Sequence, residues 1–230
     1  MKVCALVPAK GFKYAKQRLS PVLGVREREL LAEAMLRDVL GQVVGARGLE
    51  ATFVVTGDDR VSEIATGSGA QVIREPEERG ETEAVRFALA EMKQAAIQAA
   101  LILPADIPLV RSSDVGRLVE SIRECDGTAP FALLVPSHDR MGTNALLLSP
   151  PDVIRLRFGY DSFSYHLRQV ATEGLPVRVI ENERIALDID EPGDLERFLL
   201  AGESGSESHA RLMEMGLAGG FPNAQRTGSS

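Results

Sequence analysis

The chain has few of the residues that build covalent or metal-bound frameworks. Only two of its 230 residues are cysteines and three are histidines. Cys4 lies in an apolar run and Cys125 near the end of an expected helix, so both are expected to be reduced packing residues rather than a disulfide or a nucleophile. His138, His166 and His209 do not have the spacing of metal ligands. The sequence therefore does not encode a disulfide scaffold.

Long apolar runs and an excess of positive charge are also missing. No segment approaches the roughly 18 apolar residues of a membrane span, and no signal-peptide pattern is present, so we expect a cytoplasmic protein without a membrane partner. The net charge of −7 argues against nucleic acid as the main partner. Any site for an anionic ligand therefore needs a local cluster of cations.

Apolar runs alternate with helical periodicities along most of the chain. Strands are expected at residues 3–7, 52–56, 71–73, 99–103, 131–135, 144–148, 177–180 and 185–189, and helices at 26–44, near 61, 81–97, 112–124, 161–173 and from Pro192. This alternation predicts an α/β fold, a Rossmann-like, mostly parallel twisted sheet with helices on both faces. The two runs after residue 129 predict a small antiparallel excursion.

The last part of the chain loses this periodicity and gains glycine and serine. We expect one domain over residues 1–201 and a disordered tail over 202–230. Within the tail, a helical turn at 209–215 is compatible with the sequence.

One carboxylate ends the apolar run LILPADIPL at residues 101–109. Pro104 and Pro108 stop the expected strand, which leaves Asp106 at its carboxyl end, where open α/β sheets bind ligands. A single acid there suits Mg²⁺ and a phosphorylated substrate. Aspartate is also common as a turn residue, so this segment alone leaves both roles open.

Four cations follow the first strand within nine residues: Lys10, Lys13, Lys16 and Arg18. Nucleotide-binding α/β proteins place their phosphate loop at this position. Lysine and arginine would neutralise a triphosphate there in place of a glycine-rich cradle. The alternative is a solvated basic loop, but position and local charge together favour phosphate binding.

Two further segments carry candidate chemistry. Asp188 and Asp190 are two residues apart in an apolar run, so an extended backbone would point both to one side, where they repel unless a cation lies between them. They would complete a Mg²⁺ site with Asp106, although Asp190 also suits a helix N-terminus.

The other segment could hold an anion at the start of a helix. Gly159 and Ser162 offer free N–H groups and a hydroxyl there, and Thr143 adds a hydroxyl from a strand start. A simple turn and cap is the alternative for this pair. His166 lies one turn beyond Ser162 and could face the same site, but a surface histidine is expected.

Taken in order, these segments make residues 2–200 resemble the 2-phospho-L-lactate guanylyltransferases of coenzyme F-420 biosynthesis. The resemblance rests on AKQRLSP at 15–21, LPADIPL at 103–109, GTNAL at 142–146, the segment 158–166 and LDID at 187–190. The family belongs to a nucleotidyltransferase superfamily with the fold type of nucleotide-diphospho-sugar transferases, which implies a nucleotidyltransferase domain over 1–201.

The resemblance implies a role for each matching residue. Asp106, Asp188 and Asp190 would hold Mg²⁺, and Asp106 would also be catalytic together with Lys16 and Arg18. Thr143, Gly159 and Ser162 would bind the acceptor. The nucleotide-binding set implied is Lys10, Lys16, Arg18, Gly80, Thr82 and Asp106. Family members commonly show Gly-Leu-Asn where this chain has Gly80-Glu81-Thr82, which leaves the identity of the base open.

The implied reaction joins GMP from GTP to a small phospho-acid and releases pyrophosphate. Phosphoenolpyruvate is favoured as the acceptor over 2-phospho-L-lactate and 3-phosphoglycerate, which the sequence does not separate. Two other functions stay open, a molybdopterin or sugar-phosphate nucleotidyltransferase and a non-catalytic nucleotide-binding regulator. The expected partners are these small molecules. A downstream transferase stays open as a further partner, as do a monomer and a homodimer for the oligomeric state.

Overall fold

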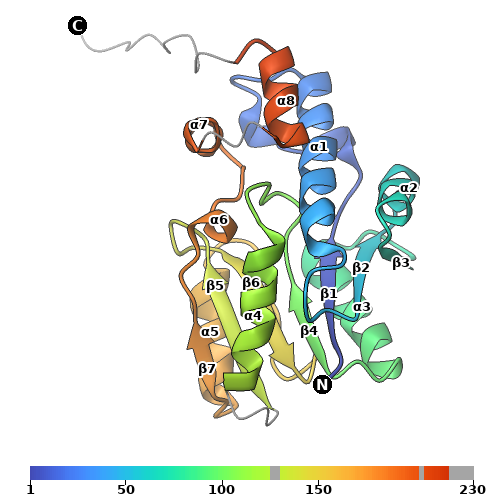
Figure 1. The fold of residues 1–230 in the computed structure, drawn as a ribbon, viewed down its shortest axis with the longest axis vertical. Helices are drawn as coiled ribbons and strands as arrows, with labels where there is room; N and C mark the ends of the chain where they lie inside the picture. The colour runs from blue at the N-terminus through green and yellow to red at the C-terminus, as the bar shows by residue number, and fades with distance from the viewer. Residues whose placement is uncertain (125–129, 202–204, 218–230) are drawn as a thin grey trace, which may run out of the picture.

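Seven strands of the described residues form one sheet in the order β3-β2-β1-β4-β6-β5-β7 (Figure 1). The computed structural model describes residues 1–124, 130–201 and 205–217, so Cys125 lies outside the described residues. The strands are β1 (Val3–Pro8), β2 (Ala51–Thr56), β3 (Gln71–Arg74), β4 (Ala99–Ile102), β5 (Phe131–Pro136), β6 (Thr143–Ser149) and β7 (Val177–Val179). Only β6 runs antiparallel to its neighbours in this sheet, β4 and β5, which confirms the expected antiparallel excursion.

Helices cover both faces of the sheet, as predicted. The helices are α1 (Val25–Val43), α2 (Asp59–Gly67), α3 (Glu81–Gln94), α4 (Ser112–Glu124), α5 (Ser162–Thr172), α6 (Glu183–Ala186), α7 (Pro192–Leu200) and α8 (Glu207–Glu214), with 3₁₀ turns η1 (Phe12–Tyr14) and η2 (Gln17–Leu19). Helices α1 and α4 pack on one face, and α3 and α5 on the other (Figure 1). No helix among these residues is both long and apolar enough to cross a membrane.

The central strands β1 and β4 are apolar because both of their faces are buried. In β4, Leu101 packs beneath α4 while Ile102 packs beneath α3. Strand β1 pairs with β2 on one side and β4 on the other, so the chain reverses its direction of winding between β1 and β4. Open α/β sheets bind their ligands at such a switch point, and the segments after β1 and β4 lie there.

The strand expected at residues 185–189 is wrong. Asn182 caps α6 there, because its side-chain oxygen accepts hydrogen bonds from the backbone N–H groups of Arg184 and Ile185 at 3.1 Å each. The following residues pair with no strand among the described residues, and the N–H of Ile189 donates to the carbonyl of Asp106 at 3.0 Å. Leu187 and Ile189 are nevertheless buried, so the expected alternation of inward apolar and outward acidic residues holds.

Asp114 anchors this part of the chain to α4. Its side chain is 0% exposed and accepts hydrogen bonds from Arg184 Nε at 2.7 Å and Asn182 Nδ2 at 3.0 Å. It also accepts from the backbone N–H of Arg111 at 3.0 Å and pairs with Arg117. Burial opposes ionisation, but the hydrogen bonds of Arg184 and Asn182 outweigh it and lower the pKa of Asp114 from 3.8 to about 2.

Replacing this carboxylate should destabilise the fold in a pH-dependent way. We expect Asp114→Asn to lower the free energy of unfolding by about 2 kcal/mol at pH 7. The loss is moderate because the arginine partners are partly solvated. A carboxylate whose pKa is lower in the folded than in the unfolded protein stabilises the fold at any pH above the unfolded pKa. The difference in the free energy of unfolding between wild type and variant should therefore shrink as the pH falls from 4 towards 2. Urea unfolding across that range tests this, with Glu120→Gln on the exposed side of α4 as control. A pH-independent difference would contradict it.

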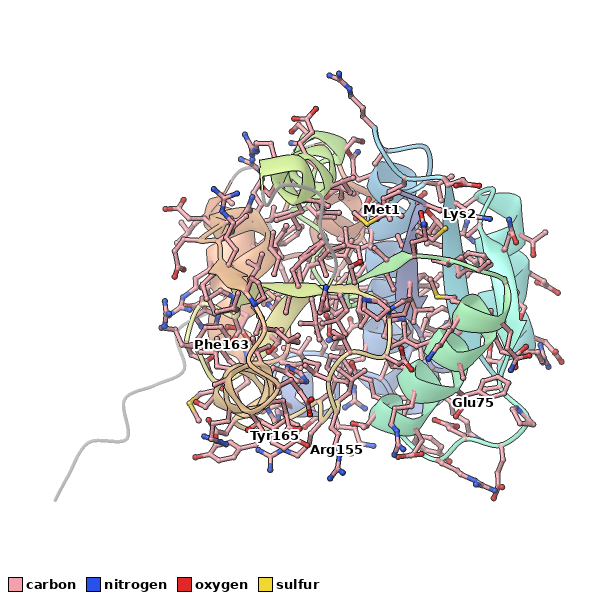
Figure 2. All side chains as sticks on the ribbon, turned by 90° about the horizontal axis from the view of Figure 1, so that it is seen from below. Met1, Lys2, Glu75, Arg155, Phe163 and Tyr165 are labelled. Carbon is pink, nitrogen blue, oxygen red and sulfur yellow. The ribbon has the colours of Figure 1, made fainter. Side chains whose placement is uncertain are left out.

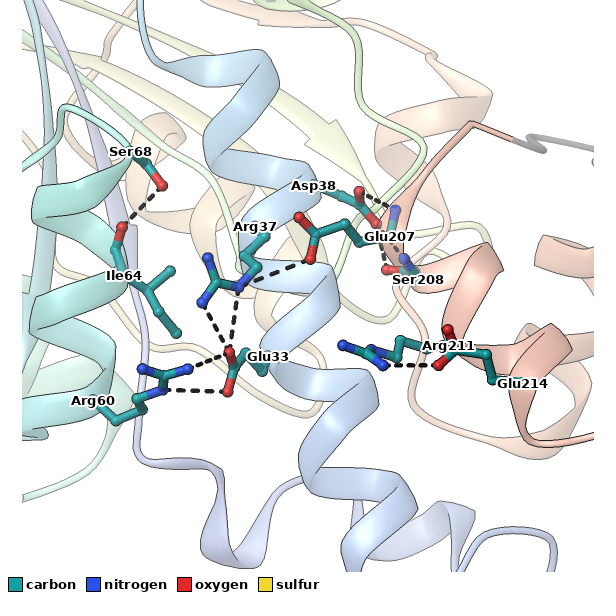
Figure 3. A network of polar contacts seen from close by, with 10 residues as sticks. All are labelled: Glu33, Arg37, Asp38, Arg60, Ile64, Ser68, Glu207, Ser208, Arg211 and Glu214. Atoms are coloured by element: carbon teal, nitrogen blue, oxygen red, sulfur yellow. Dashed lines mark hydrogen bonds and ion pairs between the residues drawn. The ribbon is translucent and has the colours of Figure 1, made fainter.

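The tail expected to be disordered from residue 202 contains α8, which packs along α1 (Figures 1 and 3). Asp38 on α1 accepts hydrogen bonds from the backbone N–H groups of Glu207 and Ser208, each at 2.8 Å. Leu212 and Leu217 are buried in the same cluster as Leu19 and Ile189. The expectation is therefore corrected for residues 205–217, while residues 218–230 lie outside the described part.

Asp38 supplies the first hydrogen bonds of α8 and should control its docking. We expect Asp38→Ala to lower the free energy of unfolding by about 1–2 kcal/mol and to speed proteolysis near residue 205. Urea unfolding and limited proteolysis measure the two effects. Arg211→Ala is the control because Arg211 makes an ion pair with Glu214 within α8 itself (Figure 3), and exposed pairs of this kind contribute little. Equal proteolysis of wild type and Asp38→Ala would contradict the assignment.

Candidate active site

A cleft of about 730 Å³ opens where the chain leaves β1 and β4. Its walls are the loops after β1, β2, β3 and β4, one side of α1, the start of α3 and Asp190. Clefts of this size hold small-molecule ligands in many proteins. The fold thus places the basic loop and the LPADIPL segment at one site, although they are far apart in the sequence.

Lys16 lies between two of the predicted aspartates. Its Nζ is 2.5 Å from Asp106 Oδ2 and 2.8 Å from Asp190 Oδ1. The lysine side chain is 10% exposed. Burial alone would lower the pKa of Lys16, but the charges of Asp106 and then Asp190 outweigh it and raise that pKa. The lysine is therefore a fixed cation at the floor of the cleft.

The charges of the other two aspartates affect the pKa of Asp188. Burial, and next the negative charge of Asp106, raise the pKa of Asp188 to about 6. Asn144 holds this carboxylate by donating from Nδ2 to Asp188 Oδ1 at 2.9 Å. The same amide nitrogen lies 3.0 Å from the carbonyl oxygen of Ile185 and 3.1 Å from that of Ala186. Asn144 thus sets the path of the segment that carries both acids, a role that the sequence analysis missed.

The acid cluster fits a divalent cation by its chemistry. Asp106 Oδ1 is buried and has no hydrogen-bond partner within the described residues, and an oxygen of this kind is suited to a metal ion. Across those residues, no three His, Cys, Asp or Glu side chains are grouped so that they could hold a metal ion, and the ammonium of Lys16 lies between Asp106 and Asp190. The donor atoms suit Mg²⁺, but they are not arranged as a closed cage.

The remaining cations of the loop lie farther out. Lys10 lines the cleft and pairs with Glu78 at 3.5 Å. The Arg18 side chain is 71% exposed and lies 3.5 Å from Glu191; in the described structure it is not part of the cleft wall. Its charge still helps to lower the pKa of Asp190, where the attraction of Lys16 outweighs the opposing effect of burial. Nucleotide contacts by Lys10 and Arg18 stay predictions.

Glu81 is a cleft residue whose role the sequence analysis did not predict. Glu81 lies at the start of α3 and is exposed to solvent, and the charges of Asp106 and Asp190 act on its carboxyl group. Partial loss of hydration in the cleft, and next the charge of Asp106, raise the pKa of Glu81 to about 7. In its protonated form this group can donate a hydrogen bond to a phosphate oxygen, whereas its ionised form repels one.

The neighbouring residues Gly80 and Thr82 do not line the cleft as described. Gly80 has φ +101° and precedes α3, a conformation that favours glycine. Thr82 Oγ1 accepts a hydrogen bond from the backbone N–H of Phe158 at 3.0 Å. This bond connects the start of α3 to the loop that carries Gly159. Their expected contacts with the nucleotide stay predictions.

Hydrogen bonds connect the three predicted acceptor-binding residues, and the backbone N–H of Ser162 donates to the carbonyl oxygen of Gly159 at 3.1 Å. The backbone N–H of Thr143 donates to Ser162 Oγ at 3.0 Å, and both residues are buried. Gly159 has φ +93° just before α5. Thr143 precedes Asn144, so this group lies next in the chain to the residue that holds Asp188.

The expectation of a surface histidine at 166 is wrong. His166 is 0% exposed on α5, together with buried Phe163, whereas Tyr165 is half-buried near the edge of the molecule (Figure 2). The rings of Phe158 and Tyr165 contact the imidazole edge-on, with centroid-to-centroid distances of 5.4 and 5.8 Å. The spacing of four from Ser162, which puts both residues on one helix face, is the signal behind the alternative that His166 faces the same site.

A family model described as "Guanylyl transferase CofC like" matches residues 3–227. The chain belongs to this family. It is 34% identical over 215 residues to the phosphoenolpyruvate guanylyltransferase of Conexibacter woesei, covering 93% of this chain and 95% of the relative. It is 35% identical to the 2-phospho-L-lactate guanylyltransferase of Methanothermobacter thermautotrophicus, covering 92% and 89%.

The fold is shared more widely than the sequence. A crystal structure from Desulfovibrio desulfuricans G20, described as a nucleotide-diphospho-sugar transferase, matches with a TM-score of 0.76 at 18% identity and covers 95% of this chain and 97% of that one. This likeness confirms the expected fold type. Membership of the guanylyltransferase family confirms the resemblance drawn from the motifs.

Proposed function

We propose that this protein transfers the guanylyl group of GTP to the phosphate of a small phospho-acid, with release of pyrophosphate. The observation that carries the proposal is the Lys16 ammonium held between Asp106 and Asp190 in the cleft of a chain from this family. The relatives' names, which specify guanylyl transfer to phosphoenolpyruvate and to 2-phospho-L-lactate, support it.

The reaction needs alignment and charge neutralisation more than proton transfer. An oxygen of the acceptor phosphate forms a bond to the α-phosphorus of GTP, and the bond from that phosphorus to the bridging oxygen of pyrophosphate breaks. The attacking oxygen is already anionic, so no general base is required. Lys16 and Lys10 would neutralise the triphosphate, while Thr143, Gly159 and Ser162 would hold the acceptor.

Mg²⁺ is part of the proposal, with Asp106, Asp188 and Asp190 as its ligands. A bound Mg²⁺ would neutralise phosphate oxygens and orient the triphosphate. Two observations support this assignment: Asp106 Oδ1 has no hydrogen-bond partner within the described residues, and burial and next the charge of Asp106 raise the pKa of Asp188.

Phosphoenolpyruvate is the acceptor we favour, because the relative from Conexibacter woesei is named for it. 2-Phospho-L-lactate and 3-phosphoglycerate share its phosphate and carboxylate and stay as alternatives. On the proposed function, the protein acts in the cytoplasm in coenzyme F-420 biosynthesis. A downstream transferase would consume its reactive diphosphate product.

Pyrophosphate release tests the proposal directly. The protein is incubated with GTP, Mg²⁺ and each acceptor in turn, and then with ATP, CTP or UTP in place of GTP. We expect release only with GTP and a phospho-acid, and its loss when EDTA removes the metal. Release only with a sugar phosphate or a pterin would support the other nucleotidyltransferases, and nucleotide binding without release would support a regulator.

A further inference from the structure

A line of hydrogen bonds runs from the loop before α5 through His166 to Thr143. The backbone N–H of Arg157 donates to His166 Nε2 at 3.3 Å. On the other side of the ring, His166 Nδ1 lies 3.0 Å from Thr143 Oγ1. The ring is completely buried, so both of its nitrogens interact within the protein.

These contacts fix which ring nitrogen carries the hydrogen. A backbone N–H can only donate, so Nε2 must accept and cannot be protonated. A neutral imidazole then carries its hydrogen on Nδ1, which donates to Thr143 Oγ1. The neutral form is favoured because burial, and next the positive charge of Arg157, lower the pKa of His166 to about 4.

This tautomer determines what the threonine hydroxyl can do. Thr143 Oγ1 accepts from the imidazole, so its own hydrogen is left to donate to another group. Ser162 Oγ is in the same state, because it accepts from the backbone N–H of Thr143. Both hydroxyls are thus prepared as donors beside the N-terminus of the 11-residue helix α5, where an anion is favoured.

We propose that His166 is a positioning residue that turns the Thr143 hydroxyl into a hydrogen-bond donor for the carboxylate or phosphate of the acceptor. The inference rests on the proposed function, since it deepens the assignment of the acceptor site. It predicts that His166 affects the binding of the acceptor and does not affect the binding of GTP. A purely structural histidine would affect both substrates or the stability.

The test compares two variants of His166 in the GTP and phosphoenolpyruvate assay. His166→Leu removes both hydrogen bonds at similar volume, and we expect the KM for phosphoenolpyruvate to rise about tenfold with the KM for GTP changed less than about twofold. His166→Asn keeps an amide donor near the place of Nδ1, and it should recover most of that loss. His209→Leu on α8 is the control and should match wild type.

A double-variant cycle tests the route of the effect. Thr143→Val removes the hydroxyl that His166 positions, so adding His166→Leu to it should cause little further loss. Independent, multiplying losses would overturn the proposal, as would a failure of Asn to do better than Leu, or equal changes in both KM values. Thermal unfolding of each variant separates loss of fold from loss of positioning.

The tautomer can be measured without any turnover. Nitrogen-15 NMR of the ring of His166 in the whole protein should show the hydrogen on Nδ1 near neutral pH. A hydrogen on Nε2 would overturn the inference while leaving guanylyl transfer intact. Conversely, a wild-type protein with the expected tautomer but no pyrophosphate release with any acceptor would refute the proposed function, and the inference with it.

Discussion

Asp106→Asn is expected to lower kcat by at least about 10³-fold while leaving the fold as stable as wild type, or more so. One carboxylate oxygen of Asp106 pairs with Lys16, and the other is buried without a partner in the described structure. Asparagine keeps the shape and can still accept from Lys16, but it lacks the charge proposed to hold Mg²⁺. The variant therefore separates charge from packing.

The expected stability change follows from the neighbours of Asp106. Its charge contributes to the raised pKa values of both Asp188 and Glu81, so the folded protein carries mutual repulsion among these acids when no ligand is bound. Removing one charge relieves that repulsion, a common pattern in which a functional site costs stability. A residue needed mainly for folding would show the opposite sign.

Pyrophosphate release and thermal unfolding, measured on the same preparation, give the two readouts. Glu77→Gln is the matched control, because Glu77 lines the same cleft but pairs with Arg79 at 2.6 Å, away from the aspartates. We expect this control to keep activity within about threefold. Activity of Asp106→Asn within tenfold of wild type, or a clear fall in its unfolding temperature, would count against the assigned role.

The sequence predicts those parts of the candidate site that are marked by a short pattern of neighbouring residues. Asp106 could be placed at a strand end because two prolines stop an apolar run, and topology then puts that end at the switch point. Asp188 and Asp190 could be placed on the same side of their segment, because buried apolar residues and outward acidic residues alternate there even though the segment is not a strand. In each case a short pattern was sufficient.

Other parts of the site depend on contacts between distant segments. Asn144 and His166 matter through partners 44 and 23 residues away, and nothing near them in the sequence indicates those partners. Helix α8 shows the same limit, since Asp38 fixes its start from 170 residues away. Its own composition resembles a tail, and Leu212 in α8 and Leu217 just after it gain a partner surface only when α1 and the loop around Leu19 are in place.

Lys16→Met should lower kcat/KM by about 10²- to 10³-fold, the usual effect of losing one charged contact to a transition state. The variant loses the cation that lies between Asp106 and Asp190 and that would otherwise neutralise the triphosphate. Without it the pKa of Asp190 should rise, because Lys16 is what holds that pKa down against burial. The folded protein should also lose stability at neutral pH, where Asp190 is ionised, and lose less at pH 4, where an Asp190 with a raised pKa is partly protonated.

Lys13→Met is the matched comparison for this prediction. Lys13 belongs to the same loop and lines the same cleft, but it is exposed and lies over the ring of Tyr14, with its Nζ 5.5 Å from the ring centroid. If the loop acted only through its overall positive charge, the two variants would lose similar activity. If the fixed position of Lys16 matters, Lys13→Met should lose less than about tenfold, and adding Asp106→Asn to Lys16→Met should recover stability but no activity. Steady-state kinetics and urea unfolding at pH 7 and pH 4 distinguish the two cases. Only for a lysine held between two carboxylates should the loss of stability on its removal depend on pH.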